Sequence, residues 1–235
     1  MDSDERVVAI SGATGGLGRA AAAAFAADGA RLGLLGTDRG RLDGLAGDLG
    51  LDEGRWAAGV GDLRDEAAAG TAFTAVTDAL GPIDVLLHLV GGYTGGVTLT
   101  DVEPKVLEEM LGQHVWSTFH ALRAVMPAMV ERGHGRIVAV TPRLTDAPAA
   151  KQGPYGAAKS AEEALLRTAA REVAGTGVTA NLIAVKAIDV DGLRDREPSP
   201  KTAGWSTPDE IVAAMRWLCS DDAASINGVR LPLGR

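Results

Sequence analysis

A tyrosine and a lysine four residues apart are the pair in this sequence best suited to chemistry. Tyr155 and Lys159 stand in the run Tyr-Gly-Ala-Ala-Lys, within a stretch of helical periodicity. Residues four apart lie on one face of a helix, so both side chains should face the same site. A phenol, with a pKa of about 10, is a poor acid–base group at neutral pH. Because an adjacent ammonium favours the phenolate, we expect Lys159 to bring Tyr155 into a useful range for proton transfer.

A glycine-rich turn near the start of the chain is the second feature with chemical meaning. The run Ser-Gly-Ala-Thr-Gly-Gly-Leu-Gly at 11–18 follows a buried apolar run at 7–10 and precedes an alanine-rich helix at 19–27. In this setting glycines let backbone N–H groups approach a diphosphate at the positive end of the helix. The alternative is that they only make a tight turn. The predicted nucleotide contacts are Gly12, Thr14, Gly16, Leu17 and Gly18.

Strands and helices must alternate along the chain to position these groups. Strands are predicted at 7–10, 31–35, 56–60, 83–90, 136–141, 178–185 and 228–233, and helices at 19–27, 39–49, 65–80, 102–132, 155–175 and 208–220. This alternation is typical of a parallel sheet covered on both faces, so we expect a doubly wound, Rossmann-like α/β fold. The length of 235 residues suits a single domain, 1–235, with an irregular excursion at about 186–208 as a substrate lid.

Composition and charge argue against several classes of protein. A net charge of −8 is unsuited to nucleic acid, which needs a clustered basic surface. No apolar run approaches the ~20 residues that cross a bilayer, and the acidic start does not resemble a signal peptide. The single cysteine, Cys219, is expected to be an inert core thiol, and the histidines lack partners at metal-ligand spacing. We therefore expect a cytoplasmic protein that acts on a small molecule without a metal.

The glycine turn and the tyrosine–lysine pair together resemble the short-chain dehydrogenase/reductase family, over essentially the whole chain. The spacing Gly12-x-x-x-Gly16-x-Gly18 is similar to the turn of that family. The resemblance implies an NAD(P)(H)-dependent oxidoreductase that interconverts a carbonyl and an alcohol by hydride transfer. It also implies that Tyr155 exchanges a proton with the carbonyl oxygen and that Lys159 holds the cofactor ribose. Relatives pair through two long middle helices, so the resemblance implies a homodimer or homotetramer.

The adenosine end of the family's site corresponds to the ends of the second and third predicted strands. By the resemblance, Asp62 and Leu63 would hold the adenine, with Asp62 accepting from the base. The alternative for Asp62 is a helix N-cap. Thr37 lies where NAD-preferring members carry an acid that binds the ribose hydroxyls. The acid that would repel a 2′-phosphate is missing at this position, so NADP(H) is favoured over NAD(H). Arg19, Arg39 and Arg41 are close enough in sequence to supply positive charge to that phosphate.

Two residues of the family's catalytic set are replaced. The serine that orients the substrate carbonyl falls at Pro142, which has no hydroxyl, so Thr141 is the expected substitute. Neighbouring residues of a strand point to opposite faces, so Thr141 can replace the serine only if the following loop shifts its register. The asparagine of the long middle helix is His114. His114 would hold a water in a proton relay to Lys159 or, alternatively, pack as an ordinary helix residue.

The surroundings of the expected nicotinamide site also depart from the family pattern. The run Asn-Asn-Ala-Gly becomes His88-Leu-Val-Gly91, in which Gly91 is retained as a cofactor contact and His88 is expected to be a hydrogen-bonded core residue. The usual Pro-Gly becomes Val185-Lys186. These replacements leave a second hypothesis open, a redox-inactive or repurposed member of the family. Such a member would be a nucleotide-binding regulator, a subunit partner, or a cyclase- or dehydratase-like enzyme.

Overall fold

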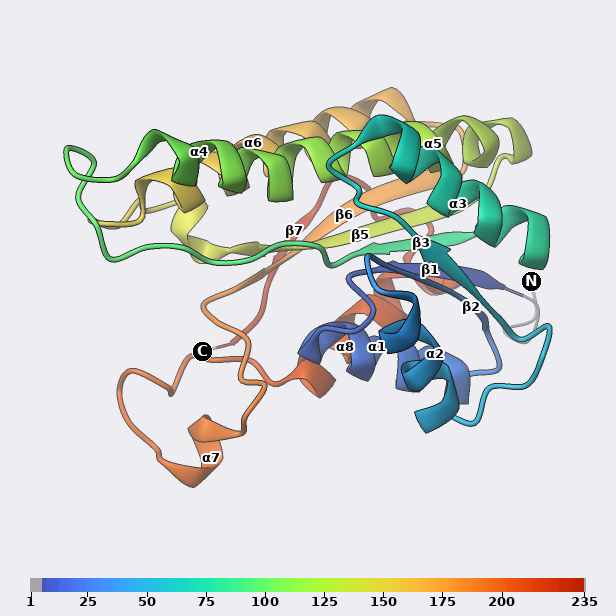
Figure 1. Ribbon diagram of the computed structural model, residues 1–235, viewed down its shortest axis with the longest axis horizontal. Helices are drawn as coiled ribbons and strands as arrows, with labels where there is room; N and C mark the ends of the chain where they lie inside the picture. Colours follow the sequence, from blue (N-terminus) through green and yellow to red (C-terminus); the bar gives the residue numbers. More distant parts are fainter. Residues whose placement is uncertain (1–5, 235) are drawn as a thin grey trace.

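A seven-stranded parallel sheet forms the centre of the molecule (Figure 1). The structure is a computed structural model and describes residues 6–234. The strand order is β3-β2-β1-β4-β5-β6-β7, and every neighbouring pair is parallel. Parallel strands need crossover helices, which cover both faces. The strands are β1 Val7–Ser11, β2 Arg31–Gly36, β3 Trp56–Val60, β4 Val85–His88, β5 Gly135–Pro142, β6 Val178–Val185 and β7 Arg230–Pro232.

Helices form one layer on each face of the sheet (Figure 1). One layer contains α1 Gly16–Ala27, α2 Arg39–Asp48 and α8 Pro208–Leu218. The other contains α3 Glu66–Leu80, α4 Pro104–Leu111, α5 Ser117–Arg132 and α6 Gly153–Glu172. Each layer buries its own apolar cluster against the sheet, with residues such as Phe25 and Met215 on one side and Phe73 and Leu166 on the other. The fold is therefore a single doubly wound, Rossmann-like α/β domain, as the sequence predicts.

The long middle helix differs from the expected uninterrupted helix at 102–132. α4 is followed by one π-helical turn, Gly112–Trp116, and then by α5. A π turn adds one residue to the helical repeat and is often found at functional sites. The turn contains His114, which is buried. β4 is also shorter than predicted, because the chain leaves the sheet after His88 and Gly91 takes a φ of +149°.

The carboxyl ends of the strands form the edge at which ligands bind in this class of fold. The order of the strands reverses between β1 and β4, and such a switch point opens a crevice. The turn after β1 is fixed to the end of β2, because the amides of Gly12 and Ala13 donate to the Leu35 carbonyl. The Gly61 amide in turn donates to the Gly36 carbonyl, so the ends of β1, β2 and β3 are joined.

The excursion at 186–208 is tied together by its own contacts. Ile188 and Ser206 form a parallel bridge at its base. The buried Asp189 carboxylate accepts from the amides of Leu193 and Arg194, which begin the short helix α7, Leu193–Arg196. This helix was not expected from the sequence, because one turn is too short to show periodicity. In Figure 1 the excursion extends beyond the carboxyl ends of the strands.

Candidate active site

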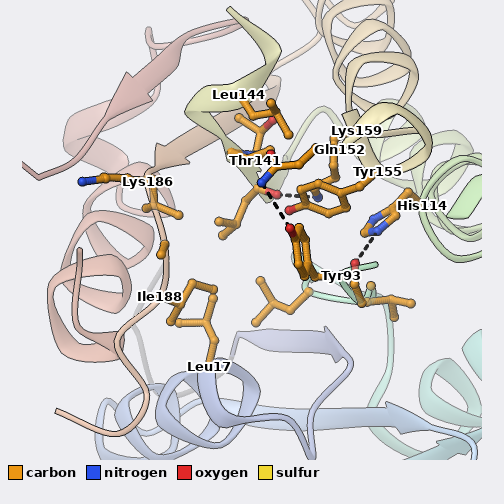
Figure 2. A pocket seen from close by; sticks show the side chains of 18 of the residues that line it. Leu17, Tyr93, His114, Thr141, Leu144, Gln152, Tyr155, Lys159, Lys186 and Ile188 are labelled. Atoms are coloured by element: carbon orange, nitrogen blue, oxygen red, sulfur yellow. Dashed lines mark hydrogen bonds between the residues drawn. The ribbon is translucent and has the colours of Figure 1, made fainter. Parts of the chain in front are cut away.

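A cavity of about 690 Å³ opens at the carboxyl edge of the sheet (Figure 2). Its volume suits a small organic ligand. The lining comes from the loop after β4, the end of β5, α6 and the excursion at 186–208. Six residues predicted for the site contribute to it: Leu17, Gly91, His114, Thr141, Tyr155 and Lys159.

Tyr155 and Lys159 occupy the first turns of α6, on the side that faces the cavity. Pro154 stands at the start of this helix, where its missing N–H costs nothing and its fixed φ suits the first turn. Lys159 is 7% exposed. Its ammonium donates to the Val140 carbonyl at 2.8 Å and to Glu162 Oε2 at 2.7 Å. The structure thus brings the predicted pair to one cavity, but it adds a carboxylate that the sequence prediction did not include.

The protonation of Tyr155 differs from the sequence expectation. Burial raises the pKa of Tyr155 to about 12, and the nearby Glu162 carboxylate acts in the same direction. The expectation that Lys159 lowers this pKa toward neutrality is wrong in the structure, because the charge of Lys159 is balanced by Glu162. Tyr155 is therefore a phenol, and a proton donor, across the neutral pH range.

Thr141 borders the cavity, but its hydroxyl is engaged elsewhere. Thr141 Oγ1 donates to Glu163 Oε2 at 3.2 Å. The same carboxylate also pairs with Arg167 at 2.6 Å and with Arg230 at 3.2 Å. The residue that replaces the family serine, Pro142, lines the cavity and offers no donor. The role of Thr141 as carbonyl orienter stays a prediction. It requires the hydroxyl to break its hydrogen bond to Glu163 and donate to the substrate carbonyl instead.

His114 lies in the wall of the cavity and contacts both the loop after β4 and α6. Its Nε2 lies 2.9 Å from the Gly92 carbonyl oxygen, and its Nδ1 lies 3.2 Å from Glu162 Oε2. The ring also packs edge-on against the ring of Tyr155, with centroids 5.6 Å apart. Gly91 must be glycine here, because its φ is positive and a Cβ atom would overlap the imidazole. These contacts place His114 beside the reactive pair, and its relay role stays a prediction.

His88 is buried beneath the cavity and has polar partners on both ring nitrogens. Ser11 Oγ lies 2.9 Å from Nδ1, and Ser117 Oγ lies 3.4 Å from Nε2. Burial lowers the pKa of His88 to about 4, so the ring is neutral at physiological pH. This agrees with the expected hydrogen-bonded core residue.

Acid should destabilise the protein through His88. A buried histidine with a lowered pKa stabilises the folded state above its unfolded pKa, near 6.5, and this contribution is lost as the pH falls toward 4. For the lowered pKa of about 4, the loss between pH 7.5 and pH 4.5 is about 2–3 kcal/mol. Urea unfolding measures the drop in the free energy of unfolding between the two pH values. This drop should be smaller in His88→Asn than in the unsubstituted protein by about this amount. Equal losses in both proteins would contradict this assignment.

The turn between β1 and α1 fits the diphosphate of a dinucleotide. Helix α1 begins at Gly16 with no side-chain cap and no acidic residue in its first turn, so its amides and positive end are available to an anion. Gly12 has a φ of +71°, and a Cβ atom there would lie 2.7 Å from the Leu89 carbonyl oxygen. A Cβ atom at Gly18 would overlap the Gly12 carbonyl oxygen. The turn can close this tightly only because it is built of glycine.

Two side chains border the same turn. Thr14 is half-buried, and its carbonyl accepts from the Arg19 guanidinium at 3.3 Å. The exposed Val190, in the excursion at 186–208, lies with its methyl groups against Gly16, where a Cβ atom would come within 2.5 Å of them. The excursion therefore reaches the glycine turn as well as the cavity.

The predicted adenosine contacts lie farther along the same edge of the sheet. Thr37 is exposed directly after β2. The Asp62 carboxylate accepts from both the amide and the guanidinium of Arg64, and this hydrogen bonding holds the pKa of Asp62 below its usual range. The N-cap alternative for Asp62 is wrong, because Asp65 caps α3 by accepting from the Ala68 amide. Leu63 is buried, and its carbonyl lies 2.9 Å from His120 Nδ1.

Three polar residues of the cavity region were not singled out from the sequence. Glu162 could have been found, because it falls in the inward stripe of α6 between Ala158 and Leu166, where a carboxylate is unexpected. Tyr93 and Gln152 lie in segments without periodicity, which gave no signal. The Gln152 amide donates to Tyr93 Oη at 3.1 Å, and the Tyr93 ring packs edge-on against Tyr155 (Figure 2).

Residues 6–234 form few sites of other kinds. No group of three or more His, Cys, Asp or Glu side chains within them is placed to hold a metal ion. No helix among them is long and apolar enough to cross a membrane. Cys219 is buried, and burial raises the pKa of its thiol to about 12. The thiol is therefore unreactive, as expected from its core position.

Comparisons with known proteins agree with this geometry. The family model for short chain dehydrogenases matches residues 6–201. D-threitol dehydrogenase of Mycolicibacterium smegmatis is 30% identical to this chain, over 97% of the chain and 91% of the relative. The 3-oxoacyl-acyl-carrier-protein reductase of Escherichia coli is 27% identical, over 98% of the chain and 96% of the relative. The crystal structure of levodione reductase superposes with a TM-score of 0.86 at 27% identity, over 98% of the chain and 96% of the relative. This chain therefore belongs to the short-chain dehydrogenase/reductase family of oxidoreductases.

Proposed function

We propose that this protein is an NADP(H)-dependent reductase that converts a small carbonyl compound to an alcohol. The observation that carries the proposal is the Tyr155–Lys159 pair in a ligand-sized cavity beside the uncapped, glycine-built start of α1. A bound reduced nicotinamide would supply the hydride. Tyr155 would donate its phenolic proton to the carbonyl oxygen as the hydride reaches the carbonyl carbon. Lys159 would hold the cofactor ribose with the donor capacity that Val140 and Glu162 leave free.

The raised pKa of Tyr155 supports the reductive direction. Reduction of a carbonyl needs a proton donor, and a phenol with a pKa of about 12 stays protonated throughout the neutral range. Oxidation of an alcohol needs the phenolate, which is scarce under the same conditions. The cavity walls add apolar surface from residues such as Leu144 and Trp205, which suits a substrate with a hydrocarbon part.

The end of β2 supports NADP(H) over NAD(H). No acid lies at Gly36 or Thr37, and the Asp38 carboxylate is occupied in capping α2 through the Arg41 amide. Of the three nearby arginines, Arg19 pairs with Asp48 and Arg39 with Asp43. Within residues 6–234, the Arg41 guanidinium has no such partner and is the one we assign to the 2′-phosphate.

The function is tested by following NADPH oxidation with a panel of small ketones and aldehydes. The unsubstituted protein should oxidise NADPH and should use NADH less efficiently. Arg41→Ala should lower kcat/KM for NADPH about 10–150-fold, because a charged hydrogen bond to phosphate contributes about 1.5–3 kcal/mol, and should leave NADH unaffected. Arg39→Ala is the control, since its guanidinium is held by Asp43 and lies over the Trp56 ring.

A second candidate function is nucleotide binding without redox turnover. It is favoured by the carboxylate that balances Lys159 and by the proline at the serine position. Thermal stabilisation by NADPH without oxidation of any carbonyl compound would support it, because a ligand that binds only the folded state raises stability. Stabilisation together with turnover would reject it.

The outer surface of the helical layer supports self-association, as in the family's homodimers and homotetramers. Trp116 and Phe119 are exposed side by side on the π turn and α5. Ala157 and Ala164 of α6 are also exposed, whereas Leu165, on the same predicted face, packs against the core of its own domain. We assign the excursion at 186–208 to a substrate lid. Its Lys186 is exposed and donates to the Lys201 carbonyl, pointing away from Tyr155 (Figure 2).

A further inference from the structure

The buried carboxylate of Glu162 contacts Lys159 of the reactive pair and has no part in the proposed reaction. Glu162 is 2% exposed and lies seven residues after Tyr155 on α6. Its Oε2 atom contacts two nitrogen groups, Lys159 Nζ at 2.7 Å and His114 Nδ1 at 3.2 Å. A buried carboxylate is stable only when charge and hydrogen bonds compensate for lost water. Glu162 is therefore the centre of a three-residue chain that joins α6 to the π turn.

The hydrogen bonds of His114 fix where one proton of this chain must be. A carbonyl oxygen can only accept, so the Gly92 contact requires a hydrogen on His114 Nε2. The other ring nitrogen, Nδ1, then faces a carboxylate oxygen across 3.2 Å, although the alignment is not that of a full hydrogen bond. Two lone pairs would repel each other there, so the contact is favourable only with a proton on Nδ1 as well. In that form His114 is connected to Lys159 through Glu162.

The charges around Glu162 come from three elements. Lys159 and Tyr155 face it from α6, His114 from the π turn and His88 from β4. Burial opposes ionisation of Glu162, but Lys159 and His114 outweigh burial and lower its pKa. His88 is neutral and adds no charge near pH 7. Glu162 is therefore ionised, and its charge acts on Tyr155 although it does not line the substrate cavity.

We propose that Glu162 is a positioning residue that holds Lys159 charged and connects it to the Nδ1 proton of His114, so that Tyr155 regains its proton after each turnover. This inference rests on the proposed reductase function. When Tyr155 has given its proton to the substrate oxygen, the phenolate takes one from the Lys159 ammonium. Lys159 regains it through Glu162 from His114, and His114, which lines the cavity, is recharged from water. One solvent proton is consumed for each alcohol formed.

The chain itself offers a matched control for Glu162. Glu163 is the next residue, is also buried, and belongs to the same helix. Its carboxylate pairs with Arg167 and Arg230 and accepts from the Thr141 hydroxyl, as a glutamine oxygen also can, and it has no contact with Lys159 or His114. Glu162→Gln and Glu163→Gln are the same chemical change one position apart. A general loss of packing or of buried charge would affect both, whereas a role in the proton chain concerns Glu162 alone.

The first measurement needs neither cofactor nor turnover. The chain has two tyrosines, so NMR of ring-labelled tyrosine in a Tyr93→Phe background follows Tyr155 alone. Glu162→Gln should lower the titration midpoint of Tyr155 below about 12, because it removes the carboxylate charge, while burial, the larger cause, keeps the midpoint above the ordinary value. Glu163→Gln should leave it in place. Equal midpoints in the Glu162→Gln protein and its parent, with circular dichroism showing both folded, would overturn the proposal.

The second measurement is steady-state reduction with NADPH. Glu162→Gln should lower kcat about 10–100-fold with KM for NADPH within about threefold, because a proton-transfer step is slowed and binding is not. Glu162→Asp, which keeps the charge, should recover part of the loss. A loss that falls on KM instead, or one that Glu163→Gln reproduces, would overturn the proposal.

Two further outcomes separate this inference from others. If Glu162→Gln does not fold, His114→Phe, which keeps a ring against Tyr155 but removes both nitrogens, tests the chain instead. It should lower kcat while leaving the Tyr155 midpoint unchanged, and an unchanged kcat would overturn the relay. If the unsubstituted protein shows no turnover but the midpoint moves as expected, the reductase function fails, and the proton relay with it. The coupling of Glu162 to Tyr155 then stands.

Discussion

Replacing Tyr155 with phenylalanine is expected to abolish carbonyl reduction while leaving NADPH binding nearly unchanged. The substitution removes only the oxygen, so the ring can still pack edge-on against Tyr93 and His114. Without the phenol no proton reaches the developing alkoxide, and kcat should fall about 10²–10⁴-fold, as for loss of other general acids. NADPH affinity, measured by quenching of tryptophan fluorescence, should change less than about threefold, since the phenol oxygen is one of many contacts.

The matched control for this result is Tyr93→Phe. It removes the other phenol oxygen of the same cavity, which accepts from Gln152 and is far more exposed. Turnover should stay within a few-fold of the unsubstituted protein. Full activity in Tyr155→Phe would exclude Tyr155 as the proton donor. A parallel loss of NADPH affinity would show instead that the side chain shapes the binding site.

Replacing Gly18 with alanine is expected to destroy nucleotide binding. The added Cβ atom would overlap the Gly12 carbonyl oxygen and come within 2.7 Å of the Ala13 carbonyl, so the backbone of the turn must shift. Overpacking of this kind costs about 1–3 kcal/mol in stability. A displaced turn can no longer present its amides to a diphosphate, so NADPH affinity should fall at least about 100-fold, equivalent to about 2.7 kcal/mol. Isothermal titration calorimetry and urea unfolding measure the two effects.

Gly15→Ala is the control within the same turn. Gly15 has a φ of −75°, which alanine adopts readily, and the nearest contact of its Cβ atom would be 3.4 Å away. Affinity and stability should remain close to those of the unsubstituted protein. If Gly18→Ala loses stability yet binds NADPH normally, the glycines make only a tight turn. That outcome would remove the main support for a dinucleotide site.

The sequence predicted the architecture closely because local patterns determine it. The strands at 56–60 and 178–185 have the bounds that alternating apolar runs indicate, and most other elements differ by one to three residues at an end. The middle helix was the exception. Its π turn adds one residue to the helical repeat, and apolar periodicity does not reveal so local a change.

By itself, the sequence also determined which residues share a helix face or a turn. Tyr155 and Lys159 share a helix face because four residues make about one helical turn, and the turn at 11–18 needs glycine at position 12, whose φ of +71° other residues resist. These are relations between near neighbours in the chain. They bring Tyr155 and Lys159 to one cavity and the glycine turn to the start of α1 without any knowledge of the packing around them.

Only the tertiary structure decided the charge and direction of the reactive groups. Burial of Tyr155 raises its pKa, Glu162 adds to this, and the same carboxylate balances Lys159 and lies beside His114 of the π turn. The Thr141 hydroxyl, at the border of the cavity, is engaged by Glu163 because β5 and α6 pack together there. Burial and ion pairing depend on distances between elements far apart in the chain, and spacing along the sequence carries no information about those distances.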